Sequence, residues 1–367
     1  MKTNTLIGVE NGADQGGIHS FNSVNLQRMQ AFHTIVIGGG PGGLACATIL
    51  AKNGVDVLLI ERNRLIGPKT CAGGLTWSGL SLDIPDHLIE RSFNRQYIYS
   101  ILQKTVVTSS VPIISTIDRK RLGQWMLRQA EEAGTRVITG VQVRDIRNGH
   151  IITSDADYRY QYLVGADGSS SLVRRHLNLD TFAIGAGIHY QVAGEFPRME
   201  WHLNTDLFRT GYAWIFPHKH YASVGVYACR RDANARKLLQ NLHQWALKYG
   251  ITLNQSRPRA ALINFDYRGW RFGNKFLVGD AAGLASGLTG EGIYPAILSG
   301  ETVAHTILDQ QYESTKLNRL IQKHQKHTRI LGLTPKNRLL CKVTMEALVA
   351  AIRSGLIHFS ALEMAER

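Results

Sequence analysis

Residues 32–62 read FHTIVIGGGPGGLACATILAKNGVDVLLIER, and this stretch decides the fold. An apolar run that ends at Ile37 enters a glycine-rich turn, and a helical pattern of small residues follows as far as Lys52. Asn53-Gly54 ends that helix, and a second apolar run stops at the acidic Glu61. The pattern predicts strand, tight turn, helix and second strand, which is the βαβ unit that binds dinucleotides.

Each position of this dinucleotide pattern has a physical role: the glycines, the helix N-terminus and the terminal acid. Gly38 makes the tight turn, Gly40 lets the backbone approach a pyrophosphate, and Gly43 lets the helix and strand pack closely. The helix N-terminus offers unpaired N–H groups and partial positive charge to phosphates. Glu61 lies 18 residues after Gly43 and can accept hydrogen bonds from ribose hydroxyls. Dinucleotide binding is therefore predicted.

Length and composition set the limits of the interpretation. The 367 residues predict two domains or one large domain with insertions. No run of 18 apolar residues that could span a membrane occurs. Residues 1–31 are polar and carry no secretory signal, so a flexible N-terminal extension is expected. The four cysteines are widely spaced, without CxxC or HExxH motifs, so we expect no metal site, no disulfide framework and a cytoplasmic location.

The net charge of +14 indicates an anionic partner or a strongly solvated surface. The excess is marked over residues 314–342, which include eight Lys and Arg residues and no acid. A solvated helix face explains this run, and so does peripheral contact with an anionic membrane. No nucleic-acid motif accompanies the charge, so nucleic acid is not an expected partner.

The rest of the chain predicts a β-rich unit between parts of the nucleotide-binding region. A helix is expected to start at Asp118 and to stop at Gly134. From 183 to 229 the pattern is mostly β, with alternation, aromatic residues and Pro or Gly punctuation. The remaining predicted elements are a helix at about 231–249, short strands near 259–265 and 275–278, and helices from Gly292 onward with a break near 333–335.

Three further stretches carry a family resemblance. YLVGADG at 162–168 and KFLVGDAAG at 275–283 are apolar strands that end in an acid beside glycine, and LTGEGI at 288–293 opens a helix. Each of these pairs alone is an ordinary turn signal, but such pairs place carboxylates at the edge of a sheet where ligands bind. Together with the βαβ unit, they resemble the FAD-dependent group-A oxidoreductases built like p-hydroxybenzoate hydroxylase, over most of residues 33–310.

The resemblance implies an α/β fold with a Rossmann-like FAD-binding domain, an inserted β-rich substrate domain and C-terminal helices. It assigns residues 32–92, 112–182 and 266–310 to a discontinuous FAD-binding domain. Residues 93–111 and 183–265 form the substrate-binding domain, and 311–367 form the C-terminal helical region.

The same resemblance implies roles for single residues. Asp280 would hold a ribitol or ribose hydroxyl, and Asp167-Gly168 would pack near the pyrophosphate and bear on NAD(P)H. The turn at 290–292 would lie beside the pyrophosphate or the flavin's N1–C2 edge, where the helix dipole stabilises negative charge. Arg119 matches a family arginine near FAD, and an exposed helix arginine is the alternative. The full implied FAD site is Gly38, Gly40, Pro41, Gly42, Gly43, Glu61, Arg62, Ala72, Gly73, Arg119, Val143, Asp167, Gly168, Gly279, Asp280, Gly290, Glu291, Gly292 and Ile293.

Two motifs point to one branch of that family. KTCAGGL at 69–75 is similar to the KxCGGGL loop of geranylgeranyl reductases, and YAWIFP at 212–217 is similar to their YxWxFP motif, which lines the lipid pocket. Ala72 replaces the first glycine after the cysteine, Gly225-Val226-Tyr227 replaces the expected GxG, and Gly287 stands where proline is common. These departures leave the flavin site intact and put the particular substrate in question.

The candidate substrate-pocket residues are Tyr212, Trp214, Phe216 and Pro217. The three aromatic residues alternate, so on a strand they share one face, either as sheet core or as an aromatic wall for an apolar substrate. Cys71 is the candidate catalytic residue, as a proton donor or redox-sensitive thiol near the flavin, and its alternative is a small residue in a glycine loop. His189, His202, His218 and His220 also fall in the β-rich unit, where a histidine could act as a proton donor, but no spacing singles one out.

The predicted function is FAD-dependent reduction of carbon–carbon double bonds in an isoprenoid lipid, with hydride from flavin reduced by NAD(P)H or another transient donor. One alternative is a flavin monooxygenase or halogenase, because 212–217 is also similar to the WxWxIP segment of halogenases. A second alternative is a flavin-binding redox sensor or scaffold without turnover. The expected partner is a hydrophobic small molecule or lipid, with peripheral membrane contact through the basic C-terminal region.

Overall fold

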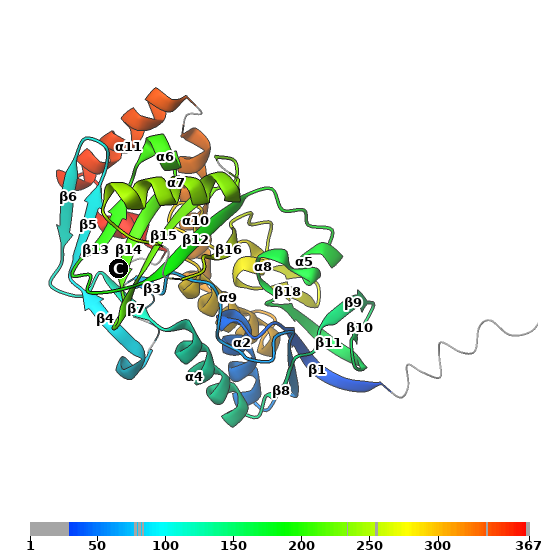
Figure 1. Cartoon of the computed structure of the whole chain (residues 1–367). Helices are drawn as coiled ribbons and strands as arrows, with labels where there is room; N and C mark the ends of the chain where they lie inside the picture. The colour runs from blue at the N-terminus through cyan, green and yellow to red at the C-terminus, as the bar shows by residue number, and fades with distance from the viewer. Residues whose placement is uncertain are drawn as a thin grey trace, which may run out of the picture.

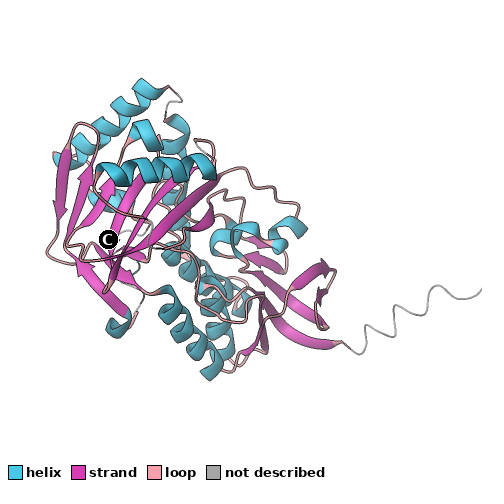
Figure 2. Cartoon of the chain, in the orientation of Figure 1, coloured by secondary structure: helices cyan, strands magenta, loops and turns pink. Residues whose placement is uncertain are grey.

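The computed structural model describes residues 29–364, apart from 77, 78, 80, 81, 83, 233, 254, 255, 335 and 336. Most of the predicted N-terminal extension, residues 1–28, lies outside this part of the chain. The described residues form three sheets and the helices that cover them (Figure 1, Figure 2).

The first sheet has the order β17-β18-β11-β1-β2-β8, and β10 and β9 continue from β11. Strands β18, β11, β1, β2 and β8 run parallel to one another, so their carboxyl ends meet at one edge. The register pairs Ile37 with both Gly165 and Ile60, which brings the ends of β11, β1 and β2 level. The strands are β1 Gln30–Ile37, β2 Val57–Glu61, β8 Arg136–Thr139, β9 Val143–Arg147, β10 His150–Thr153, β11 Asp157–Gly165, β17 Arg271–Phe272 and β18 Lys275–Leu277.

The second sheet has the order β16-β12-β15-β14-β13-β5-β6, and all its neighbours are antiparallel except β13 and β5. Its strands are β5 Arg95–Tyr99, β6 Lys104–Thr108, β12 Ile184–Ala193, β13 Met199–His202, β14 Tyr212–Pro217, β15 Tyr221–Cys229 and β16 Arg259–Asn264. A small antiparallel sheet, β3-β7-β4, is made of β3 Gly74–Thr76, β7 Ile114–Ile117 and β4 Ile89–Phe93. The Thr116 hydroxyl donates to the Pro217 carbonyl at 2.8 Å, which ties the small sheet to the second one.

The longer helices lie where the sequence predicts them, and the main difference is the first residue of the helix expected from 231. The helices are α2 Pro41–Lys52, α4 Arg119–Glu132, α5 Leu172–His176, α6 Thr205–Phe208, α7 Ala235–Lys248, α8 Gly279–Ala282, α9 Ile293–Leu308, α10 Thr315–Leu333 and α11 Arg338–Arg353, with 3₁₀ turns η1 Asp86–Leu88, η2 Gly168–Ser170 and η3 Phe359–Leu362. The prediction of a helix from 231 was early, because the Asn234 side chain caps α7 by accepting the Lys237 N–H at 2.9 Å. No helix within the described residues combines the length and apolarity needed to cross a bilayer.

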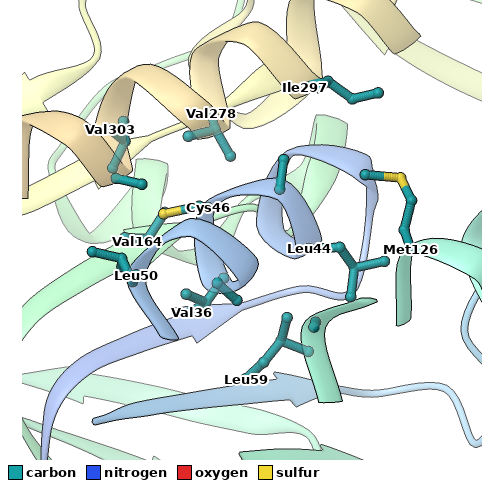
Figure 3. Close-up of a cluster of buried hydrophobic side chains, with 14 of the residues drawn as sticks. Val36, Leu44, Cys46, Leu50, Leu59, Met126, Val164, Val278, Ile297 and Val303 are labelled. Atoms are coloured by element: carbon teal, nitrogen blue, oxygen red, sulfur yellow. The ribbon is translucent and has the colours of Figure 1, made fainter. Parts of the chain in front are cut away.

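Helix α2 is buried between the first sheet and α9 (Figure 3). Leu44, Cys46 and Leu50 from α2 pack with Val36 and Val303, and all of these are 1% exposed or less. Full burial of a side chain such as leucine stabilises the fold by about 1.5–3 kcal/mol. The small residues of the sequence pattern thus give a helix that is covered on both sides.

The turn that starts α2 is packed more closely than any side chain would allow. A Cβ at Gly43 would lie 2.1 Å from the Gly38 carbonyl oxygen, and a Cβ at Gly300 of α9 would lie 2.1 Å from the Gly42 carbonyl oxygen. Gly38 itself has φ +109°, which side chains rarely adopt. Two helices and two strands therefore meet at backbone contact around residues 38–43.

We predict that Gly43→Ala destabilises the protein by about 3 kcal/mol, because the added methyl must displace backbone. Urea denaturation followed by circular dichroism, without added nucleotide, measures the change. Gly332→Ala in α10 is the matched control: apart from its chain neighbours and its own helix backbone, no described residue has an atom within 4 Å of the added Cβ, so stability should stay equal or rise by up to about 1 kcal/mol. Equal stability of Gly43→Ala and the unaltered protein would contradict the packing argument.

Candidate functional site

Two adjoining cavities lie at the carboxyl edge of the first sheet. One is lined by the turn at 38–41, by 60–63, by 141–144 and by 166–170, and its volume is about 580 Å³. The other begins at Gly40–Gly42 and extends to the second sheet, past the loop that contains Cys71. Gly40, Pro41, Lys69, Arg119, Ala166, Gly168, Ala261 and Leu262 line both. We call them the nucleotide cavity and the aromatic cavity.

The nucleotide cavity presents an acid and a helix N-terminus side by side. Glu61 accepts the Gly39 N–H at 2.8 Å through Oε2, and Asn63 donates to Oε1 from its backbone N–H at 2.9 Å. Gly40 caps α2 and Pro41 occupies its first turn, which contains no acidic residue. No side chain caps the first turn of α2, so its N–H groups and partial positive charge suit a phosphate.

Asp280 lines the aromatic cavity and contacts two residues that line the nucleotide cavity. The Ser169 hydroxyl donates to its Oδ2 at 3.0 Å, and Lys69 Nζ lies 3.1 Å from the same oxygen. The Lys69 side chain is 51% exposed, so this ion pair adds little to stability. Because Lys69 is the exposed partner, a ligand hydroxyl can take its place at the carboxylate while the ammonium group stays in water.

Asp167 holds the start of α5 and also lines the nucleotide cavity. Its Oδ2 accepts the Leu172 N–H at 2.6 Å, at the start of α5. Burial raises the pKa of this carboxyl, and hydrogen bonds from Ser171 and Leu172 oppose that rise. The residue lines the nucleotide cavity while its side chain is held by the protein.

Arg119 is buried at the start of α4, not exposed on a helix face. Within the described residues its Nη1 has no hydrogen-bond partner, although it lines both cavities. Burial lowers the pKa of the guanidinium, and the nearby Cys71, Asp118 and Asp280 raise it. A buried cationic donor of this kind requires an acceptor, and a phosphate or a flavin carbonyl would supply one.

The Cys71 loop is held from the second sheet. His218 Nε2 lies 3.0 Å from the Ala72 carbonyl oxygen, and its Nδ1 bonds Glu90. A Cβ at Gly73 would lie 2.5 Å from the His218 ring. The partly exposed Cys71 thiol accepts the Gly73 N–H at 3.4 Å and lines the aromatic cavity.

One face of the second sheet forms the aromatic wall. Tyr212, Trp214 and Phe216 alternate along β14 and line the aromatic cavity, while Ala213 and Ile215 pack in the core on the other face. The Tyr212 hydroxyl donates to the Thr289 carbonyl at 2.5 Å. Burial raises its pKa, as do Glu291 and Cys71. This tyrosine is therefore neutral, and its hydroxyl proton is already used in a hydrogen bond within the protein.

The start of α9 closes the cavity from the other side. Gly292 is its N-cap, and the preceding Glu291 accepts the Thr76 hydroxyl at 2.7 Å and the Met364 N–H at 3.1 Å. Phe359, Leu362 and Glu363 from the C-terminal segment complete the lining.

Most residues predicted from the sequence line one of the two cavities. Those at the nucleotide cavity are Gly38, Gly40, Pro41, Glu61, Arg62, Arg119, Val143, Asp167 and Gly168. Those at the aromatic cavity include Gly42, Cys71, Ala72, Tyr212, Trp214, Phe216, Gly279, Asp280, Gly290, Glu291, Gly292 and Ile293. Gly43, Gly73 and Pro217 line neither: Gly43 packs on Gly38, Gly73 on His218, and Pro217 faces Thr116.

The sequence did not single out several residues at these cavities. Ser169 directly follows Asp167-Gly168, so its position in the sequence could have indicated that it lies at the sheet edge beside the ligand. His189 and Trp201 line the aromatic cavity from β12 and β13. Nothing in the sequence pattern connects Phe359 and Glu363 to the site, because only the return of the C-terminal segment brings them there.

Comparisons with known proteins agree with this geometry. The family described as FAD binding domain matches residues 31–194. The chain is 27% identical to geranylgeranyl diphosphate reductase of Oryza sativa, over 81% of this chain and 70% of that protein. It is 28% identical to digeranylgeranylglycerophospholipid reductase 2 of Methanothermobacter thermautotrophicus, over 80% of this chain and 83% of the relative.

Solved structures share the fold. A geranylgeranyl bacteriochlorophyll reductase-like protein of Thermoplasma acidophilum superposes with a TM-score of 0.73 at 21% identity, covering 92% of this chain and 96% of that one. A probable FAD-dependent monooxygenase of Pseudomonas aeruginosa superposes with a TM-score of 0.60 at 18% identity, covering 90% and 98%. The predicted mixed α/β FAD-binding fold of the p-hydroxybenzoate hydroxylase type, with C-terminal helices, is confirmed.

FAD is the cofactor of this fold, and the residues present fit it. The uncapped N-terminus of α2 suits the pyrophosphate, Glu61 and Asp280 suit sugar hydroxyls, and the unpartnered Nη1 of Arg119 suits an anionic or carbonyl oxygen.

We predict that Glu61→Gln lowers FAD affinity about 10- to 100-fold, because a charged acceptor is replaced by a neutral amide. Titration of flavin-stripped protein with FAD, followed by flavin fluorescence, gives the dissociation constant. Glu132→Gln, at the far end of α4 and exposed, should leave it unchanged. Equal affinities of Glu61→Gln and the unaltered protein would remove Glu61 from the proposed FAD site.

Proposed function

We propose that this chain is an FAD-dependent reductase of carbon–carbon double bonds in an isoprenoid lipid, because residues 31–194 match the FAD binding domain and the chain is similar to geranylgeranyl reductases. One observation supports this most directly. The aromatic cavity begins at the glycine turn of the cofactor site, passes Cys71 and ends at the aromatic wall of the second sheet. An apolar chain in it would lie beside a cofactor held at the sheet edge.

Different residues of the chain would bind the cofactor and orient the substrate. When bound, FAD supplies the hydride chemistry. Glu61, Asp280 and the N-terminus of α2 would hold its polar parts, while Trp214 and Phe216 would orient an apolar chain and exclude water. We propose the first sheet as the FAD-binding domain and the second as the substrate domain, with the boundaries predicted from the sequence.

Cys71 is the proposed proton donor of the site. Its thiol lies where the two domains meet, close enough to act electrostatically on Arg119 and Tyr212. The His218 contact to Ala72 and the bulk of His218 against Gly73 would keep the thiol in place. A fixed thiol beside a buried cation can supply a proton to a carbon that becomes electron-rich during reduction.

The electron donor is proposed as NAD(P)H binding transiently. The sequence contains a single GxGxxG, at 38–43, and that turn belongs to the FAD site. A nicotinamide dinucleotide would therefore dock without a Rossmann turn of its own.

We predict that anaerobic protein with FAD, NAD(P)H and prenyl alcohols or diphosphates yields products that gain two hydrogens per turnover, seen by mass spectrometry. Cys71→Ser should keep FAD binding and lower the turnover number at least tenfold. Cys229→Ala, outside both cavities, serves as the matched control and should keep full turnover.

Other outcomes of this experiment separate the alternatives. A product that gains oxygen or halogen, formed only in air, would replace the reductase by a monooxygenase or halogenase. Oxidation of NAD(P)H with no change in any prenyl compound would favour a flavin-binding redox sensor or scaffold.

We also propose that α11 contacts an anionic membrane. Leu339, Leu340 and Val343 are 54–70% exposed, and the exposed Arg338 precedes them. Figure 1 shows α11 at the periphery of the molecule, next to β6 and α6. Its buried residues Val349 and Ile352 pack in the same cluster as the aromatic wall. A lipid bound to this helix would therefore be near the proposed substrate cavity.

We predict that the protein sediments with vesicles containing phosphatidylglycerol and not with phosphatidylcholine alone. The double variant Leu339→Glu/Val343→Glu should lose at least tenfold in affinity, because two apolar side chains on one face become anionic. Phe182→Glu, 77% exposed between α5 and β12, is the control for added charge. Equal sedimentation of both variants would remove α11 from the contact.

A further inference from the structure

One buried histidine faces the apolar half of the aromatic cavity. His189 lies on β12 and is 4% exposed, and it lines the cavity together with Gly187 two residues earlier on the same face. Gly225 stands opposite it on β15, where a Cβ would lie 2.6 Å from His189 Cβ and 2.4 Å from Trp214 Cζ2. Gly225 therefore leaves the room that the His189 side chain and the Trp214 indole ring occupy.

A chain of hydrogen bonds sets the tautomer of this ring. Trp214 Nε1–H donates to Ser223 Oγ at 3.0 Å, and Ser223 Oγ lies 3.0 Å from His189 Nδ1. Indole N–H can only donate, and Ser223 is buried, so its hydroxyl proton is satisfied when it points to Nδ1. Nδ1 is then the acceptor, and the ring proton lies on Nε2.

The Nε2–H group is left without a protein partner. Its nitrogen is fully buried, and no hydrogen bond to it occurs within the described residues. Burial lowers the pKa of His189 to about 4, with Arg259 and His218 acting in the same direction. The ring is therefore neutral near pH 7 and cannot serve as a proton source there, but it can donate a hydrogen bond.

We propose that His189 Nε2–H donates a hydrogen bond to an uncharged oxygen, a carbonyl or hydroxyl, on an otherwise apolar ligand in the aromatic cavity. The inference deepens the proposed function and rests on it, because it takes this cavity as the substrate site. His189 is then a specificity-determining residue that fixes how far the ligand enters.

The surroundings favour an uncharged oxygen over an anion. The other basic side chains that line the aromatic cavity, Lys69 and Arg119, also line the nucleotide cavity, and Lys69 is paired with Asp280. His189 does not line the nucleotide cavity, and its neighbours on the wall of the aromatic cavity, Gly187 and Trp214, carry no charge. Arg259, its partner on β16, is exposed and lines neither cavity. A neutral donor in such surroundings suits a neutral acceptor, since an anion would lose its hydration without gaining a counter-charge.

The test compares a terpenoid methyl ketone with the hydrocarbon of the same carbon skeleton, each added in the same detergent to the FAD-loaded protein. Quenching of tryptophan fluorescence reports binding. The unaltered protein should bind the ketone about tenfold more tightly. His189→Leu should lose this preference while its hydrocarbon affinity stays the same. Tyr190→Phe, on the opposite face of β12, should keep the preference.

Nitrogen-15 NMR of histidine-labelled protein provides a second measurement. It reads the tautomer and charge of His189 in the unaltered protein, so it does not depend on whether a His189 variant folds. His189 should appear as the neutral Nε2–H tautomer from pH 5.5 to 8, because its pKa of about 4 lies below that range. An Nδ1–H tautomer, or a charged ring at pH 7, would overturn the proposal.

Binding also distinguishes this inference from the function on which it rests. Equal weakening of ketone and hydrocarbon by His189→Leu would mean that the ring only packs the wall, and the proposal would fail. A His189-dependent ketone preference in a protein that reduces no prenyl double bond would overturn the reductase assignment and leave the hydrogen-bond donor in place.

Discussion

Backbone contact around the glycine turn is the constraint on which the other features depend. Residues 38–43 touch Ala166, which directly follows β11, and Gly300 of helix α9, at distances that leave no room for a Cβ. These contacts join segments more than a hundred residues apart, and they make the ends of the parallel strands level. The helix N-terminus, Glu61 and the Asp167 turn can share one cavity only because this packing is so close.

The second sheet provides what the first cannot. A cofactor site at a sheet edge is open to water, and the aromatic wall, the Cys71 loop and the C-terminal segment give it an apolar side. Hydrogen bonds tie the two halves together, and those from His218 to Ala72 and from Thr116 to Pro217 lie next to the Cys71 loop. Since these contacts hold the loop that carries Cys71, the position of the thiol depends on the docking of the second sheet.

Buried polar groups mark the two ends of the joined cavities. Within the described residues, Arg119 has an unpartnered donor where the two cavities meet, and His189 has one in a residue that lines the aromatic cavity alone. Folded proteins rarely leave such groups unsatisfied, because the lost hydration is not recovered. Arg119 and His189 both line a cavity, so we propose that a ligand completes the hydrogen bonds of these two donors.

The sequence by itself determined the cofactor half of this protein. The βαβ unit, the strand-terminal acids and the aromatic alternation at 212–216 are local patterns, and local periodicity predicts which residues share an edge or a face. Only the tertiary structure decided what meets across the two sheets. Arg119 is a buried donor, Gly73 and Pro217 line neither cavity, and of the four histidines named from the sequence only His189 lines one of the two cavities. The physical reason is that burial and hydrogen-bond partners depend on contacts between distant segments, which no local spacing encodes.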